Sequence, residues 1–181
     1  MAREWKLLGT RDAFTCRLFK LKVKEFLSPK TGKPHEFYQI ETRDWVGIIP
    51  LLNEEVILVR QFRHGSEEMS LEIPGGIMDE DDPFGAALRE LQEETGFKAN
   101  KMELLGVLRP QPALFNNRFY VFLATELEKV GDPLPEESEE IELVKMPLDQ
   151  VLKDMASGKI DHALVLAAFE LLRLRYPELL K

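Results

Sequence analysis

Residues 75–97 constrain this chain more than any other part of its sequence. A pair of glycines runs into an acidic loop, and the loop leads into a helix that is expected to begin at Pro83 and to stop at Gly96. Proline suits the first turn of a helix, with Asp82 or Asp81 as its N-cap, and glycine suits the position after the last turn. The segment therefore predicts a turn, an acidic loop and one well-delimited helix.

One side of that helix carries three carboxylates. At about 100° per residue, Glu90, Glu93 and Glu94 project within a sector of roughly 100°, while Leu88 and Leu91 project on the opposite side. Like charges three and four residues apart destabilise a helix, so the cluster favours a bound cation. Oxygen ligands on one rigid element suit Mg²⁺, with Mn²⁺ as the alternative ion. A solvated acidic face is the alternative interpretation.

The same segment resembles the Nudix box, the signature of hydrolases that act on a nucleoside diphosphate linked to another group. The box reads glycine, five residues, glutamate, seven residues, and then Arg-Glu-aliphatic-any-Glu-Glu-any-Gly-apolar. Its second half is matched in full, by Arg89, Glu90, Leu91, Glu93, Glu94, Gly96 and Phe97. In the first half Asp81 takes the glutamate position and Gly75 the glycine position. Counted from Gly76, the loop is one residue short.

The flanking sequence resembles that of ADP-ribose pyrophosphatases and related nucleoside-diphosphate-sugar hydrolases. The similarity covers roughly residues 15–175. It includes residues 59–65 and 71–76 before the box, Pro112 after it, and residues 158–163 near the C-terminus. Residues 112–118 differ from the corresponding segment of the usual ADP-ribose enzymes. The resemblance therefore does not identify the sugar of the substrate.

The resemblance implies a metal site on the helix. Glu90, Glu93 and Glu94 are the expected ligands, with the backbone carbonyl of Gly75 as a further one, and Glu90 is also a candidate catalytic residue. Arg89 is expected to orient Glu90 or a neighbouring carboxylate by bidentate pairing. A plain surface ion pair is the alternative role for this arginine.

A general base must lie within hydrogen-bond reach of the attacking water. Alone, the acidic residues 135–141 would indicate a solvated loop. By resemblance they supply the base, which is expected to be Glu137, with Glu140 as the alternative. The candidate phosphate and substrate contacts are Arg63, Glu72, Arg109 and Arg118.

Aromatic and histidine residues give weaker indications. Candidates for stacking on the nucleobase are Trp5, Phe37 and Phe115, with ordinary packing as the alternative. The three histidines show no metal-ligand spacing and are expected to be structural; they are His35, His64 and His162. The sequence has no P-loop motif.

The composition and the N-terminal sequence argue against several classes of protein. A net charge of −8 disfavours non-specific binding to nucleic acid or to anionic membranes. The single cysteine, Cys16, excludes an internal disulfide framework and is expected to be a buried apolar residue. The N-terminus has no signal core, and no apolar run approaches about 18 residues, so a cytoplasmic location is expected.

Alternating apolar residues predict an antiparallel N-terminal sheet. After the box helix, a mixture of strands and helices is expected. The predicted strands are 15–27, 36–42, 45–50, 56–63, 102–109, 118–125 and 141–146, with an acidic loop at 126–140 and further helices from Pro147 to Gly158 and over 162–175.

These elements predict an α+β protein, and the resemblance implies the α/β/α sandwich of the Nudix fold, a mixed central sheet between helices. Residues 1–45 are expected to form the N-terminal antiparallel strands, and residues 46–181 the hydrolase domain. In ADP-ribose-type relatives these strands reach a second subunit and help to build its substrate pocket, so a homodimer is expected. An N-terminal sheet packed only on its own domain is the alternative.

The expected activity is Mg²⁺-dependent hydrolysis of the pyrophosphate bond of a nucleoside-diphosphate sugar, such as ADP-ribose or GDP-mannose. The products would be a nucleoside monophosphate and a sugar phosphate. One alternative is a Nudix enzyme for nucleoside triphosphates, dinucleoside polyphosphates or nicotinamide dinucleotides. The other is a non-catalytic module that binds ADP-ribose.

Overall fold

The computed structural model describes residues 3–79, 81–134 and 140–179. The chain forms two compact units. The smaller unit comprises Met1–Asp44 and Arg109–Arg118, and the larger unit comprises Trp45–Leu108 and Phe119–Lys181.

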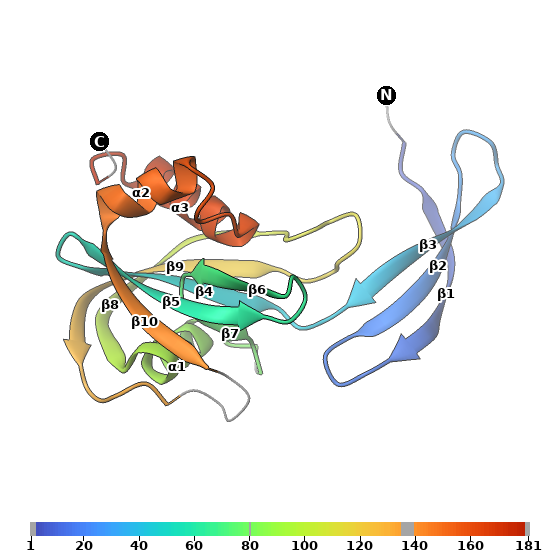
Figure 1. Ribbon diagram of the computed structural model, residues 1–181. Helices are drawn as coiled ribbons and strands as arrows, with labels where there is room; N and C mark the ends of the chain where they lie inside the picture. Colours follow the sequence, from blue (N-terminus) through green and yellow to red (C-terminus); the bar gives the residue numbers. More distant parts are fainter. Residues whose placement is uncertain (1–2, 80, 135–139, 180–181) are drawn as a thin grey trace. The chain divides into compact units, whose positions relative to one another are not determined.

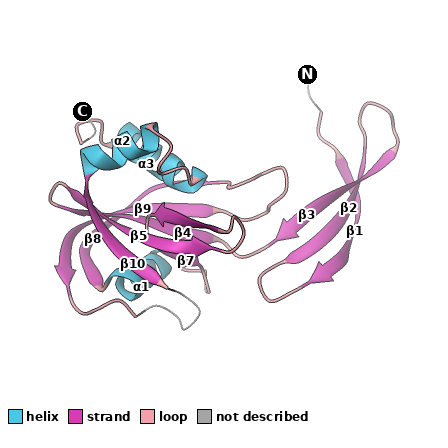
Figure 2. Ribbon diagram, in the orientation of Figure 1, coloured by secondary structure: helices cyan, strands magenta, loops and turns pink. Residues whose placement is uncertain are grey.

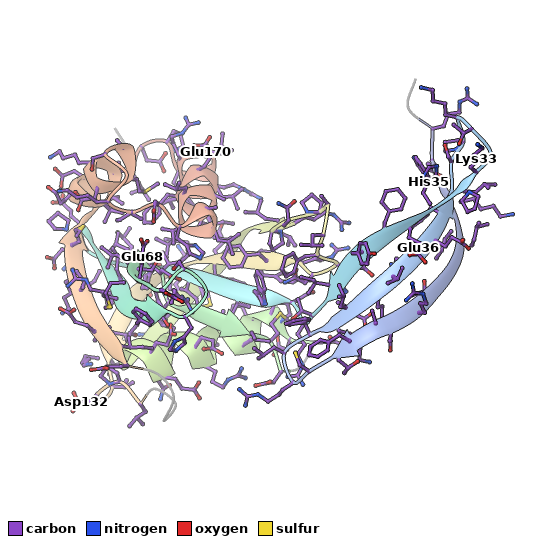
Figure 3. All side chains as sticks on the ribbon, turned by 45° about the vertical axis from the view of Figure 1, so that its right-hand side comes forward. Lys33, His35, Glu36, Glu68, Asp132 and Glu170 are labelled. Atoms are coloured by element: carbon purple, nitrogen blue, oxygen red, sulfur yellow. The ribbon has the colours of Figure 1, made fainter. Side chains whose placement is uncertain are left out.

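The smaller unit is built on a three-stranded antiparallel sheet in the order β1 (Lys6–Thr15), β2 (Lys20–Leu27), β3 (Pro34–Glu41). Lys33, His35 and Glu36 mark β3 and the turn before it in Figure 3. Every residue of β1 is exposed. The segment Arg109–Arg118 joins this unit through Ile40, whose N–H donates to the Leu114 carbonyl at 2.8 Å.

The sequence predicted one strand over residues 15–27, whereas the structure has two strands meeting near residue 16. A tight turn separates them, closed by the N–H of Cys16 donating to the Phe19 carbonyl at 3.0 Å. Cys16 is exposed, so its predicted burial is wrong. The turn interrupts the alternation on which that prediction depended.

Within the described residues, the larger unit holds a seven-stranded mixed sheet (Figure 2). Strands β4 and β9 run parallel to each other, and the other pairs are antiparallel. The main order is β10 (Ile141–Pro147), β5 (Glu55–Arg63), β4 (Trp45–Leu52), β9 (Phe119–Lys129), β8 (Phe97–Leu108), with β6 (Glu68–Glu72) on β5 and β7 (Gly75–Ile77) on β4.

Helices cover both faces of this sheet. Helix α1 (Pro83–Thr95) lies on one face, and α2 (Leu148–Ala156) and α3 (Ala163–Arg175) lie on the other (Figure 1). The predicted α+β class, with a mixed sheet between helices, is confirmed.

Alternation along β4 produces two cores, because successive side chains of a strand point to opposite faces. Ile48 packs in the cluster that includes Leu91 of α1. Its neighbour Ile49 packs in the cluster that includes Val151 of α2 and Phe169 of α3. All five side chains are at most 1% exposed, so the sheet is fixed from both sides.

Strands β6 and β7 are missing from the sequence prediction. Strand β7 begins with two glycines, which have low strand propensity, and β6 is only five residues long. Pairing with β5 and β4 holds them in the sheet. Strand β9 also continues to Lys129 inside the predicted acidic loop, because its polar end pairs with the start of β8.

The described helices include none with the length and apolar character needed to span a membrane.

Candidate active site

A pocket of about 400 Å³ opens in the larger unit. This volume lies within the range of small-molecule sites. Its polar lining side chains come from β5, β6, α1 and the start of α3: Gln61, Arg63, Glu72, Glu94 and His162. Its walls include the aromatic rings of Trp45 and Phe119 and the backbone of the glycine pair. The pocket therefore combines apolar walls with a few convergent charges.

Arg63 and Glu72, both predicted substrate contacts, form a bidentate ion pair in this pocket. Arg63 Nε donates to Glu72 Oε1 at 2.8 Å, and Arg63 Nη2 donates to Oε2 at 2.7 Å. The Glu72 side chain is 5% exposed, against 45% for Arg63. Burial raises the pKa of the Glu72 carboxyl, but the hydrogen bonds and charge of Arg63 outweigh burial and leave this pKa below its ordinary value of 4.5.

The glycine pair lies directly against two carboxylates of α1. The N–H of Gly75 donates to Glu94 Oε2 at 2.8 Å, and Glu94 is 4% exposed. A Cβ at Gly76 would lie 2.7 Å from the carboxyl carbon of Glu90, and one at Gly75 would lie 2.2 Å from the Val46 carbonyl oxygen. A side chain at Gly75 would meet backbone, and one at Gly76 would fit only if the Glu90 carboxylate moved, so the glycines allow the backbone to approach the acidic helix.

Arg89 lies among the neighbouring carboxylates. Its Nη2 is 3.4 Å from Glu90 Oε1 and 3.7 Å from Asp79 Oδ2, and its Nε is 3.8 Å from Glu93 Oε2. The sequence predicted bidentate pairing with one carboxylate. The described contacts are instead spread over three, which partly neutralises the charge on this side of the helix.

The donor set fits a hard divalent cation. Glu90 and Glu94 supply carboxylate oxygens on either side of the glycine backbone, and such cations prefer oxygen ligands. Glu93 lies beside Arg89 with 49% of its side chain exposed. Among the side chains that the structure describes, no group of three or more His, Cys, Asp or Glu is already gathered around one point.

The helix bounds are as the sequence predicted. Asp82, not Asp81, caps the N-terminus, since its Oδ1 accepts the N–H of Gly85 at 3.1 Å. Gly96 ends the helix in the left-handed conformation, with φ of 68°. Both caps fix the register in which Glu90 and Glu94 face the glycine pair.

The chain enters the acidic run from the C-terminal end of α1. Leu134 N–H donates to the Glu93 carbonyl at 2.7 Å, and Val130 N–H donates to the Gly96 carbonyl at 3.0 Å. Glu137, the predicted base, lies outside the described residues. Its alternative, Glu140, is exposed and directly precedes β10.

Arg109 and Arg118, also predicted as substrate contacts, are exposed and belong to the smaller unit. The backbone N–H of Arg118 donates to Asp44 Oδ1 at 2.7 Å. In the same unit Trp5 and Phe37 pack edge to face, with ring centroids 5.4 Å apart. The third predicted stacking residue, Phe115, is half-buried.

The pocket-lining residues that sequence reasoning missed include Trp45, Gln61 and His162. A signal existed for Gln61, because it lies two positions before Arg63 in a predicted strand and so shares its face. His162 was predicted to be structural. Its place in the pocket depends on where α3 begins against the sheet, which no local pattern encodes.

Comparison with known proteins identifies the family. The NUDIX domain model matches residues 41–169. The ADP-ribose pyrophosphatase of Bacillus subtilis (strain 168) is 29% identical over 95% of this chain and 94% of its own length. The methanol dehydrogenase activator of Bacillus methanolicus has the same identity and coverage.

A solved structure described as an ADP compounds hydrolase superposes with a TM-score of 0.87. It covers 98% of this chain and 97% of its own, at 25% identity. Proteins of this family generally use divalent metal ions. The chain therefore belongs to the Nudix family, has the Nudix fold, and is a hydrolase of pyrophosphate bonds.

Proposed function

We propose that this chain hydrolyses the pyrophosphate bond of a nucleoside-diphosphate sugar, with ADP-ribose as the first candidate. The observation that carries the proposal is the pocket itself. It places the Arg63–Glu72 pair in one cavity with Glu94 and the glycine pair. The names of the relatives that act on ADP-ribose and on ADP compounds support the same substrate class.

Glu90 and Glu94, with Glu93 and the carbonyl of Gly75, would hold Mg²⁺, or Mn²⁺ in its place. When bound, the ion would supply positive charge beside the pyrophosphate and would lower the pKa of a water molecule that it coordinates. Glu137, or alternatively Glu140, accepts the proton of the attacking water. Since Arg63 donates to Glu72 through both Nε and Nη2, the pair presents a fixed surface to the substrate.

The remaining expectations belong to the same proposal. Arg109 and Arg118 contribute further contacts to the phosphates or the nucleoside. The smaller unit pairs with a second copy of the chain, and its strands contribute to the partner's substrate pocket. A cytoplasmic location stays a prediction.

A substrate panel tests the activity. Purified protein is incubated with ADP-ribose, GDP-mannose, UDP-sugars, dinucleotides and nucleoside triphosphates, each with Mg²⁺ and with Mn²⁺. Phosphate released after phosphatase coupling ranks them. A nucleoside-diphosphate sugar should lead. A nucleoside triphosphate or dinucleotide at the top would replace this substrate class, and no hydrolysis of any would refute the proposal.

Glu94→Gln tests the site. It removes an oxygen ligand while keeping the size of the side chain, so kcat should fall by about 10²-fold or more. Glu128→Gln, at an exposed position of β9, is the matched control and should keep full activity. Near-complete activity of Glu94→Gln would defeat the metal assignment.

A further inference from the structure

His162 lines the pocket, but it neither stabilises the helix that it precedes nor belongs to the proposed metal site. It occupies the N-cap position of α3, yet its side chain makes no capping hydrogen bond. Serine, threonine, aspartate and asparagine are the residues that stabilise this position. Its side chain is 34% exposed and lines the pocket beside Glu72.

The surroundings of the imidazole decide where its proton lies. Within the described residues, Nδ1 is buried and has no hydrogen-bond partner. A buried N–H without an acceptor is unfavourable, whereas a bare ring nitrogen lone pair is tolerated better. This favours the tautomer with the proton on Nε2, on the side of the ring that approaches Glu72.

The distance between the His162 and Glu72 side chains leaves room for one hydroxyl group. His162 Nε2 lies 3.9 Å from Glu72 Oε2, which is longer than a hydrogen bond. A hydroxyl group placed about 2.8 Å from both atoms would accept from Nε2–H and donate to the carboxylate. Arg63 already binds both oxygens of Glu72 and fixes the carboxylate in place for such a contact.

We propose that His162 and Glu72 together bind one hydroxyl group of the sugar portion of the substrate, with His162 as donor and Glu72 as acceptor. The inference rests on the proposed function, because it names a contact to the sugar of a nucleoside-diphosphate sugar. It makes His162 a specificity residue: it favours substrates whose diphosphate is linked to a hydroxylated sugar over those with a plain leaving group.

The test compares ADP-ribose with ADP methyl ester, which carries the same nucleoside diphosphate but no second sugar. His162→Ala should raise KM for ADP-ribose about tenfold, the effect of one lost hydrogen bond, with kcat little changed. KM for the methyl ester should stay the same. His162→Gln, which keeps an N–H donor, should recover part of the loss. His64→Ala, outside the pocket lining, is the control.

The outcomes separate the two proposals. Equal changes of KM on both substrates, or no change on either, would overturn the role of His162 while leaving the activity standing. If the wild type hydrolyses neither compound, calorimetric titration with each compound in the presence of Mg²⁺ gives a second readout. His162→Ala should then weaken ADP-ribose binding selectively. Absence of wild-type binding in that titration would overturn both proposals.

Discussion

Gly75 and Gly76 are adjacent in the chain, yet a methyl group at the two positions would meet different kinds of neighbours. At Gly76 it would meet the carboxylate of Glu90, the far end of a side chain that can rotate. At Gly75 it would meet the backbone of β4 at Val46 and Gly47, which cannot. The same substitution should therefore separate catalysis from stability.

Gly76→Ala should leave the free energy of unfolding nearly unchanged and lower kcat at least tenfold, because Glu90 must turn away from its position. Gly75→Ala should lower the free energy of unfolding by about 1–3 kcal/mol, the usual range for overpacking. Urea unfolding and steady-state kinetics measure the two effects. Gly65→Ala, with open space around its Cβ, is the control. An active Gly76→Ala enzyme would contradict the role given to Glu90.

Glu72 makes stability depend on pH in a defined direction. Its pKa in the folded protein lies below the ordinary 4.5. Its contribution is therefore fully present above the unfolded value and is lost as pH falls through the folded pKa. The difference in free energy of unfolding between wild type and Glu72→Gln should be about 1–2 kcal/mol at pH 7, discounted for the half-exposed Arg63. It should shrink as the pH falls below about 4.5.

Urea unfolding of both proteins at several pH values measures this difference, and subtraction removes the other carboxylates that titrate in the same range. Glu142→Gln is the matched control, because Glu142 pairs with Arg60 at 3.0 Å and both side chains are exposed. A surface pair contributes about 0–1 kcal/mol. A Glu72 difference that grows as the solution becomes more acidic would contradict the linkage.

Among the secondary-structure elements, α1 was predicted most accurately from the sequence, because the residues at both of its ends have strong preferences for helix termini. Asp82, Pro83 and Gly96 each favour one position of a helix terminus, and the structure uses all three there. Strand β1 had no such signal. Its ten residues are all exposed, so no apolar face set a period that sequence reasoning could detect.

The contacts within the pocket could not be predicted from the sequence. Arg63 and Glu72 were predicted from the resemblance, but their bidentate pair depends on the antiparallel pairing of β5 with β6. Trp45 and His162 lie more than a hundred residues apart in the chain and share a cavity only through the tertiary fold. Long-range packing of this kind leaves no periodic or capping pattern in either local sequence.

Helix α3 gives a prediction at this scale. Since His162 provides no side-chain cap, His162→Ser should add a hydrogen bond to the first turn and raise the free energy of unfolding by about 1 kcal/mol. Urea unfolding measures the gain, and His162→Ala, which has no capping group, should not show it. A gain in stability coupled to weaker substrate binding would indicate that function, not helix stability, places histidine there.

At the scale of the whole molecule, the sheet of the smaller unit exposes many apolar side chains. Its apolar side chains are 42–57% exposed at Trp5, Leu7, Leu8, Phe14, Leu18, Phe37 and Tyr38. Exposed apolar residues gathered on one small sheet mark interaction surfaces, and among the described strands β1 has a neighbour on one side only. These features support the proposal that a second copy of the chain covers this sheet.

Light scattering after size exclusion should therefore give twice the chain mass of 20.9 kDa. The double variant Leu8→Glu, Phe14→Glu should elute as a single chain, because buried carboxylates without partners oppose association. Leu174→Glu alters an equally apolar exposed residue of the larger unit and should stay dimeric. If the strands of one copy help to build the pocket of the other, kcat/KM should fall with the double variant. A single-chain wild type, or a double variant that stays dimeric, would mean that this sheet does not form the interface.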